Sequence, residues 1–327
     1  LERATAGAGA SGAAAGMLAP SAEAQYGESE LVQMGLESLG MWPDFAAQLE
    51  RESGVDVDLR RQGTLIVAVD RDDLEWLRHA QLERERLGLA ARMIDGDAAR
   101  ELEPHLAPTI PGAVWCPDDH QVDPRRLVQA LRSAFEKQGG RLLEGVEVKG
   151  VQIEADLAAG VELATGVEAL APTATVIVAA GAWTRELTGL DDAPRVRPVR
   201  GQMLAVELGA PPLCEHVIRA PDAYLVPRSD GRLVIGATME EMGFDPRHTA
   251  GGVMDLLVGA WEALPAIHDA PIVEMWTGFR PMTIDSEPVM RRSDSVANLV
   301  YATGHGRNGV LLTPLSARRI ADLVRTA

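Results

Sequence analysis

The chain has 327 residues, of which 46% are hydrophobic and 24% charged, and its formal net charge is -17. This length predicts two closely joined domains, and the acidic balance argues against nucleic acid or an anionic membrane as a partner. No apolar run reaches the ~18 residues that a membrane span requires. Cys116 and Cys214 are too few for a disulfide framework or a metal cluster, and no secretory signal opens the sequence, so we expect a cytoplasmic protein.

Residues 4–20 consist almost wholly of Gly, Ala and Ser. This composition is typical of a flexible linker, and equally of backbone that passes close to a flat ligand. The second interpretation is favoured because an amphipathic helical pattern follows at once, from residue 23 to about residue 50. A strand is predicted over 64–69 and a helix over 72–87.

The rest of the chain alternates between two kinds of pattern. Asp123 and Pro124 predict the start of a helix that runs to about residue 137. The later elements are expected as strands at 141–149, 161–165 and 176–180, antiparallel strands at 202–207, 223–227 and 232–237, a helix at 251–264, a strand toward residue 276, a strand at 299–302 and a C-terminal helix to about residue 324.

This order predicts an α/β fold with an α+β insert. Strands expected in a parallel sheet occur at the start of the chain, near 141–181 and at its end. The antiparallel strands at 202–237 lie between the second and third of these groups. A chain that returns in this way completes a nucleotide-binding domain around an inserted substrate domain. The predicted cofactor domain comprises 1–60, 125–195 and 270–327, and the predicted substrate domain comprises 61–124 and 196–269.

The segment 301–310 gives the strongest indication of a site. A strand ends there in the Gly-rich turn GHGRNG, which is expected to open a helix, so free backbone N–H groups and the positive helix end would face an anion or the polar edge of a flavin. An ordinary Gly-rich turn between a strand and a helix is the alternative. Arg307, within the turn, favours a site.

Arg280 and Tyr224 are the candidate substrate contacts. Arg280 ends an apolar strand directly before a proline, and its planar guanidinium matches a carboxylate. Tyr224 lies on an otherwise apolar strand and could present its hydroxyl beside that arginine. The alternatives are a surface or salt-bridging arginine and an ordinary core tyrosine.

Other chemistries lack the residues they need. The seven histidines are scattered without metal-ligand spacing, and no GxSxG sequence is present, so neither a metal site nor a hydrolase is expected. Residues 7–12 match GxGxxG in letters, but no strand precedes them. A redox cofactor would explain why so few reactive side chains are present.

Four stretches together resemble the D-amino-acid oxidase superfamily, in particular its glycine oxidase type: GASGAAAGMLAP (9–20), AYLVPRSDGRLVIGATME (223–240), WTGFRPMT (276–283) and ATGHGRNGVLLTP (302–314). The resemblance extends from residue 1 to about residue 321. It implies a GR2-type, Rossmann-like FAD-binding domain with an inserted antiparallel-sheet substrate domain. It also implies that the strand, glycine fingerprint and helix that open such domains are absent before Leu1, so these 327 residues alone are expected to retain FAD poorly.

By matching position, the resemblance also assigns contacts. FAD would be met by Glu2 and Arg3 at the ribose, by Ala10, Ser11, Ala15, Gly16 and Met17 along the pyrophosphate and flavin, by the backbone of Val148 at the adenine, and by His305, Gly306, Arg307, Asn308, Gly309, Val310 and Leu311 around the flavin edge. Substrate would be held by Arg280, Arg307 and Tyr224, with Met239 in the pocket wall.

The implied activity is oxidative deamination of glycine or a similar small amine, with O2 as oxidant, H2O2 as product and a link to thiamine biosynthesis. A sarcosine or D-amino-acid oxidase or dehydrogenase of the same superfamily, or a chain that binds no flavin and has no activity, are the alternatives. The expected partners are therefore a small amino acid and O2. The sequence leaves undecided whether the protein forms a homo-oligomer.

Overall fold

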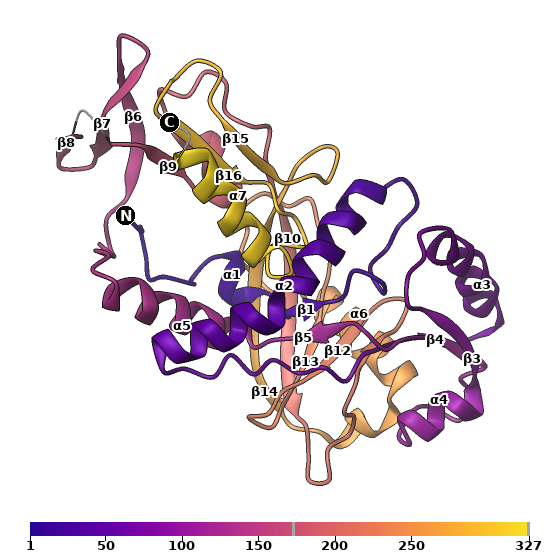
Figure 1. Cartoon of the computed structure of the whole chain (residues 1–327). Helices are drawn as coiled ribbons and strands as arrows, with labels where there is room; N and C mark the ends of the chain where they lie inside the picture. The colour runs from indigo at the N-terminus through magenta and orange to yellow at the C-terminus, as the bar shows by residue number, and fades with distance from the viewer. Residues whose placement is uncertain (172–173, 326–327) are drawn as a thin grey trace.

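The computed structural model describes residues 1–171 and 174–325 (Figure 1). Its α-helices are α1 (Ala10–Ala13), α2 (Ser29–Ser53), α3 (Arg71–Arg86), α4 (Gly96–Leu102), α5 (Pro124–Lys137), α6 (Ala250–Ala263) and α7 (Thr313–Arg325), with 3-10 helices η1 (Gly181–Glu186) and η2 (Pro265–Asp269). No helix among the described residues is long and apolar enough to cross a membrane.

The strands before the long central pair are β1 (Met17–Leu18), β2 (Thr64–Ala68), β3 (Arg92–Asp95), β4 (Gly112–Cys116), β5 (His120–Gln121), β6 (Val148–Glu154), β7 (Leu157–Leu163), β8 (Gly166–Ala169) and β9 (Val176–Val178). The others are β10 (Arg197–Glu207), β11 (Val217–Arg219), β12 (Tyr224–Pro227), β13 (Arg232–Gly236), β14 (Ile272–Met282), β15 (Val289–Arg292) and β16 (Leu299–Thr303).

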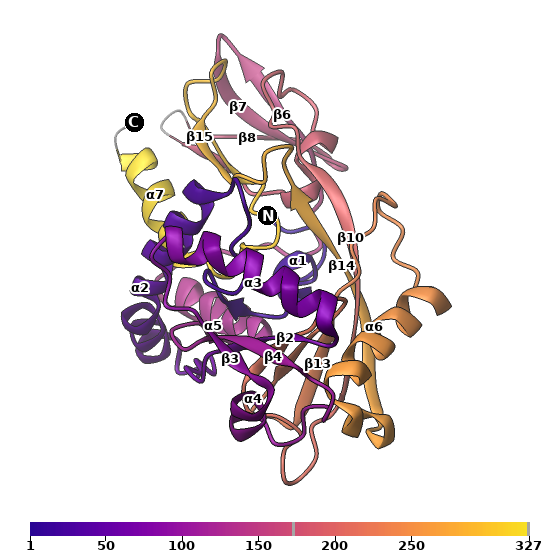
Figure 2. The ribbon, with the colours of Figure 1, turned by 90° about the vertical axis from the view of Figure 1, so that its right-hand side faces the viewer.

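An eight-stranded sheet in the order β14-β10-β13-β12-β11-β2-β4-β3 forms the larger half of the molecule. All its pairs are antiparallel except β11 with β2. Its two longest strands, β10 and β14, run side by side along the molecule (Figure 2). β14 therefore hydrogen-bonds into the antiparallel sheet, although it follows residue 270, where the sequence predicts a return to the cofactor domain.

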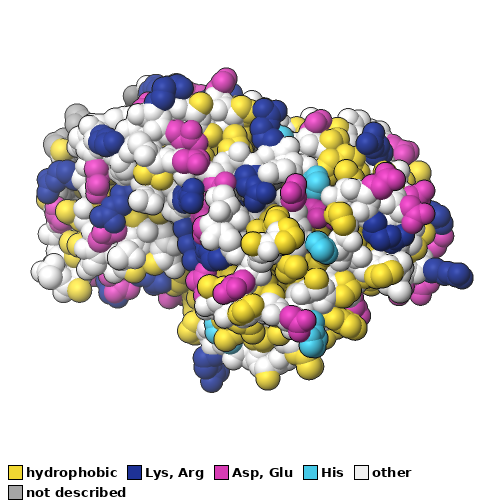
Figure 3. Space-filling model, turned by 90° about the horizontal axis from the view of Figure 1, so that it is seen from below, with side chains coloured by type: hydrophobic (Ala, Val, Ile, Leu, Met, Phe, Trp, Pro, Cys, Tyr) yellow, Lys and Arg dark blue, Asp and Glu magenta, His cyan; other side chains and the backbone are white. Residues whose placement is uncertain are grey.

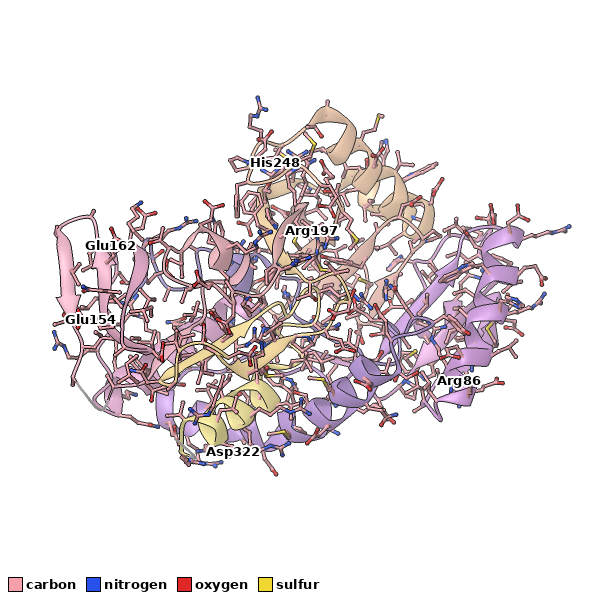
Figure 4. The ribbon with its side chains drawn as sticks, turned by 90° about the horizontal axis from the view of Figure 1, so that it is seen from above. Arg86, Glu154, Glu162, Arg197, His248 and Asp322 are labelled. Carbon is pink, nitrogen blue, oxygen red and sulfur yellow. The ribbon has the colours of Figure 1, made fainter. Side chains whose placement is uncertain are left out.

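Two three-stranded sheets form the other half. One has the order β15-β16-β9, with β16 parallel to β9, and the other is the antiparallel β6-β7-β8 meander. Seen from above, the labelled Glu154 and Glu162 of the meander lie at one end of the molecule and Arg86 of α3 at the other, with Arg197 of β10 between them (Figure 4). The parallel pair β9–β16 is the element that the sequence predicts for a nucleotide-binding domain.

Helices cover the sheets through separate apolar clusters. Leu256 and Ala260 of α6 pack against Leu204 of β10 and Ile235 of β13 on one face of the large sheet. Helices α2 and α5 pack together around the fully buried Trp42, and the start of α7 packs against α2 at an angle (Figure 1). The opposite face of the large sheet is left to pack against the small residues around Ala15.

Three predicted boundaries are wrong, each near a glycine with positive φ. Helix α2 begins at Ser29, not near residue 23, because Gly27 has φ +85°. Strand β6 begins at Val148, not 141, since Gly145 has φ +72° and only an isolated bridge at Glu144 precedes it. The turn 304–309 does not open a helix directly, and α7 begins only at Thr313. The Asp123 cap of α5 is confirmed, as its carboxylate accepts from two backbone N–H groups.

Asp192 ties the loop after η1 to the β15–β16 hairpin. Its Oδ1 accepts from the Tyr301 hydroxyl at 2.7 Å and the Ser293 hydroxyl at 2.9 Å, and its Oδ2 accepts from the Asp294 N–H at 2.7 Å. Burial alone would raise the pKa of Asp192, but these hydrogen bonds and the Arg291 guanidinium hold it well below its ordinary range. The ionised carboxylate therefore stabilises the folded chain.

Replacing Asp192 with Asn is expected to lower stability by about 1.5–3 kcal/mol, the usual contribution of hydrogen bonds to a charged group. Because the folded pKa is depressed, the difference in Tm from wild type should be complete above the ordinary aspartate pKa of about 4 and shrink as the pH falls below it. Asp294→Asn is the matched control, since that carboxylate is 83% exposed beside the same Arg291. Equal losses for both variants would contradict the assignment.

Candidate active site

A cavity of about 1180 Å³ lies between the cofactor-side sheets and the open face of the large sheet. Its walls include the small-residue segment that contains α1, the strand β9 and the ends of β14 and β16. Most of the sequence-predicted site residues line it, namely Glu2, Arg3, Ala10, Ser11, Ala15, Gly16, Met17, Val148, Tyr224, Arg280, His305, Gly306, Arg307, Gly309 and Val310. The tertiary structure thus gathers residues from both ends of the chain into one place.

Arg280 and Tyr224 both extend over the large sheet, where two glycines leave room for them. A Cβ atom at Gly201 of β10 would lie 2.4 Å from Nη1 of Arg280, and one at Gly236 of β13 would lie 2.7 Å from the Tyr224 ring. The Arg280 Nη1 donates to the carbonyl of Thr238 at 3.0 Å. Neither glycine was predicted as a site residue, since nothing in the local sequence around them marks them.

Arg280 and Arg307 both line the cavity but differ in their partners. Among the described residues, no carboxylate lies at ion-pair distance from Arg280, whereas Arg307 contacts the Glu28 carboxylate. Burial raises the pKa of Tyr224, while the nearby Arg280 acts in the opposite direction. The hydroxyl therefore stays protonated near neutral pH, and the pair offers one O–H donor and one cation toward a small anion.

Arg307 already has protein partners. Its Nη1 donates to Glu28 at 3.2 Å, its Nη2 also contacts Glu28, and its Nε lies 4.0 Å from Glu23. That Nε is buried and has no hydrogen-bond partner in the described part of the chain. Glu23, which also lines the cavity, was not singled out from the sequence.

The small-residue segment passes close to several neighbours, as its composition suggests. At Gly16, φ is +76° and a Cβ would lie 2.1 Å from the carbonyl of Val122, so no side chain fits. The buried Arg228 donates to that same carbonyl at 2.7 Å and also to the carbonyl of Ala15. Burial lowers the pKa of Arg228 to about 10, which leaves it charged. The backbone from Ala15 to Met17 is thereby fixed in the cavity wall.

The first residues of the chain lie at the other end of the cavity. The N–H of Glu2 donates to the carbonyl of Leu143, and its carboxylate accepts from the N–H of Ala4, both at 2.9 Å. The guanidinium of Arg3 lies 4.0 Å from the ring centre of Trp183, a cation–π contact. Trp183 also lines the cavity, although no role was predicted for it.

The turn after β16 brings His305 into the wall. Burial lowers the pKa of its imidazole to about 4, so the ring is neutral at physiological pH, and its Nε2 hydrogen-bonds with the Ser316 hydroxyl of α7 at 2.9 Å. A neutral histidine leaves the cavity wall here without a permanent charge.

Three predicted contacts lie elsewhere. Asn308 and Leu311 are buried behind the cavity wall, where the Leu311 carbonyl accepts from Ser38 and Trp42. Met239 is 64% exposed and does not line the cavity, because β13 ends at Gly236 and the chain turns outward. The expectation that Met239 forms part of the pocket wall is therefore not met by its position.

A second hollow of about 720 Å³ lies outside this cavity, over α6 and the start of β14. Apolar side chains gather on the face seen from below (Figure 3), and those exposed on these two elements are Met254, Val258, Trp261, Ile272, Val273 and Met275. In the described part of the chain, the lining of this hollow contains no Arg, Lys, Asp or Glu side chain. It therefore has no arginine or lysine that could bind the carboxylate of a substrate. No cluster of His, Cys, Asp and Glu among the described residues could hold a metal.

A parallel strand pair, a Gly-rich cavity wall and an arginine–tyrosine pair on an antiparallel sheet define an α/β protein with room for an extended cofactor beside a small anion. The chain belongs to the FAD-dependent oxidoreductases: the family described as "FAD dependent oxidoreductase" matches residues 1–323. The predicted family and its α/β fold are thereby confirmed.

Relatives narrow the resemblance. The chain is 37% identical over 329 residues to the glycine oxidase of Geobacillus kaustophilus, covering 99% of this chain and 85% of that protein. The crystal structure of glycine oxidase from Geobacillus kaustophilus aligns with a TM-score of 0.91 at 34% identity, covering 99% of this chain and 87% of that one. The present chain is also 34% identical over 320 residues to the bifunctional protein ThiO/ThiG of Trichormus variabilis. This alignment covers 97% of the present chain but 47% of that protein. The chain thus spans about half the length of this bifunctional relative.

Gly201→Ala is expected to displace the Arg280 guanidinium, because the new methyl group would overlap Nη1. If Arg280 binds anions, the dissociation constant for acetate, measured by calorimetry, should rise at least about tenfold, equivalent to ~1.4 kcal/mol. Gly251→Ala is the control, since nothing lies within 4 Å of a Cβ at that position. Unchanged acetate binding in Gly201→Ala would remove this glycine from the site.

Proposed function

We propose that the protein uses FAD to oxidise glycine or a similarly small amine to the imine, which water hydrolyses to glyoxylate and ammonia, with O2 as oxidant and H2O2 as product. The observation that carries this proposal is the Arg280–Tyr224 pair. Arg280 is a cation in the cavity wall without a protein carboxylate at ion-pair distance among the described residues, and Tyr224 adds a protonated hydroxyl. A substrate α-carboxylate satisfies both groups.

The cavity walls fit FAD. The stretch of wall from residue 7 to residue 16 contains only Gly, Ala and Ser, so a flat ring system can approach its backbone closely. Glu2 and Arg3 would hold the ribose end, and the turn at His305–Val310 the flavin edge. When bound, FAD would supply the hydride acceptor that no side chain can provide.

The chain's own residues then have positioning roles. Arg280 and Tyr224 hold the carboxylate and fix the orientation of the α-carbon, which contributes through proximity and not through proton transfer. The buried, neutral His305 adds no charge to the wall, and its Nε2 hydrogen-bonds with the Ser316 hydroxyl. Arg307, held by Glu28, contributes positive charge from a fixed position.

The names of two relatives support the biological setting. Glycine oxidase and ThiO/ThiG are the names of proteins similar to this chain, so we assign its product to thiamine (thiazole) biosynthesis. A reducing cytoplasm suits Cys116 and Cys214, both buried free thiols. A homo-oligomer stays a prediction.

Arg280→Ala is expected to raise the KM for glycine at least about tenfold, since a desolvated charge-assisted hydrogen bond contributes about 1.5–3 kcal/mol. Flavin content should stay at the wild-type level, because the arginine binds the substrate and not the cofactor. Arg247→Ala is the control: that side chain is 82% exposed and pairs with Asp245 away from the cavity lining. Wild-type kinetics in Arg280→Ala would exclude it from the site.

Glycine and sarcosine are expected to be oxidised faster than D-phenylalanine. Tyr224 and Met203 line the cavity together with Arg280, with the Tyr224 hydroxyl 3.9 Å from the Met203 sulfur, so they take up space that a bulky substrate side chain would need. A peroxide assay over a panel of amines measures the order. Turnover of D-phenylalanine well above that of both small amines would instead assign the protein to the D-amino-acid oxidases.

A further inference from the structure

The segment between β1 and α2 is held from two sides by buried charged side chains. On one side, the carboxylate of Asp119 accepts from the N–H of Ser21 at 3.1 Å and from the N–H of Ala22 at 2.8 Å. On the other side, Arg84 of α3 donates to the carbonyl of Ser21 at 3.0 Å and to that of Ala22 at 3.3 Å. We call Asp119 and Arg84 the backbone clamp.

The clamp is deeply buried. Asp119 is 0% exposed and Arg84 is 3% exposed. Burying such groups costs desolvation free energy, which the four hydrogen bonds of the clamp to the Ser21 and Ala22 backbone offset. Each carboxylate oxygen of Asp119 serves one adjacent peptide N–H, so both peptide planes are fixed in orientation.

The residue that follows the clamped dipeptide faces the cavity. Glu23 lines the cavity, and its carboxylate lies 3.9 Å from Arg219 and 4.0 Å from Arg307. Its charge also acts on the Tyr224 hydroxyl. Arg219 in turn donates to the Ala22 carbonyl at 2.9 Å, so the clamped backbone and the cavity charges are joined directly.

We propose that Asp119 and Arg84 are positioning residues, which fix Glu23 and through it the charge arrangement at the substrate end of the cavity. Neither residue touches the substrate. They act by holding the Ser21–Ala22 backbone, so that Glu23 keeps Arg219 and Arg307 in place beside Tyr224. This inference rests on the function proposed above.

The clamp predicts a dependence on pH. Burial raises the pKa of Asp119 to about 7, against the backbone hydrogen bonds from Ala22 and Ser21 that lower it. The other charged or titratable groups facing it are Arg84, Arg219, Cys116 and Glu23, with His120 next in the chain. Below about pH 7 the protonated carboxyl has one acceptor fewer for the two N–H groups, so the clamp loosens as the pH falls.

Asp119→Asn tests the proposal in the full-length protein as its gene encodes it, loaded with FAD. The amide has the same shape but turns an NH2 group toward one of the two N–H donors. We expect the KM for glycine to rise about tenfold at pH 8, with kcat within about twofold of wild type. Wild-type KM should rise as the pH falls through 7, whereas the KM of the variant should stay flat over the same range.

Glu103→Gln is the matched control, because Glu103 is also buried, at 2% exposed, and also accepts from two successive backbone N–H groups, those of Glu215 and His216. It does not line the cavity, so its variant should lose stability without a change in KM. Arg84→Met supplies a second variant of the clamp, judged at a temperature at which its near-UV circular dichroism matches wild type.

The outcomes separate the two proposals. If wild type is active and Asp119→Asn has the same KM and the same pH profile as wild type, the proposed role of the clamp is wrong. It is also wrong if Glu103→Gln changes KM as much as Asp119→Asn does. If Asp119→Asn does not fold, an unchanged KM in folded Arg84→Met overturns it instead. A wild-type protein that neither oxidises glycine nor binds acetate by calorimetry overturns the proposed function, and this inference with it.

Discussion

Backbone hydrogen bonds between β10 and β14 determine where the site can form. The two strands pair from Arg197 opposite Met282 to Val206 opposite Ile272, so they connect the antiparallel sheet to the cavity. A slip of one residue in this register would turn Arg280 to the opposite face of the sheet. Gly201, on the neighbouring strand, provides the space for that side chain. The position of the candidate anchor therefore depends on a pairing between segments far apart in the sequence.

The arginines in and behind the cavity wall differ in their partners, and this difference separates the candidate anchor Arg280 from Arg307, Arg219 and Arg228. Arg307 and Arg219 are accompanied by Glu23, and Arg307 also by Glu28. Arg228 is held by carbonyl groups behind the wall. Arg280 donates to a carbonyl oxygen and faces the cavity beside Tyr224. An incoming carboxylate therefore meets Arg280 without having to displace a protein carboxylate from it, within the part of the chain that is described.

Local patterns were sufficient for most individual elements. The Asp123–Pro124 start of α5, the strand at 64–68 and the antiparallel strands that carry Tyr224 and Leu233 follow from capping, alternation and turn residues. Predictions failed where one glycine changed the backbone direction, as at Gly27 and Gly145, because a positive φ depends on the surrounding packing.

The sequence by itself determined the family, the α/β class and the pairing of Arg280 with Tyr224 as candidates, because these follow from contiguous stretches of residues. Only the tertiary structure decided that Glu23 lies near both Arg219 and Arg307, that Met239 is exposed away from the cavity, and that Asp119 holds the Ser21–Ala22 backbone. Such contacts join segments that are separated by about a hundred residues or more, and no local propensity or spacing encodes which of them meet.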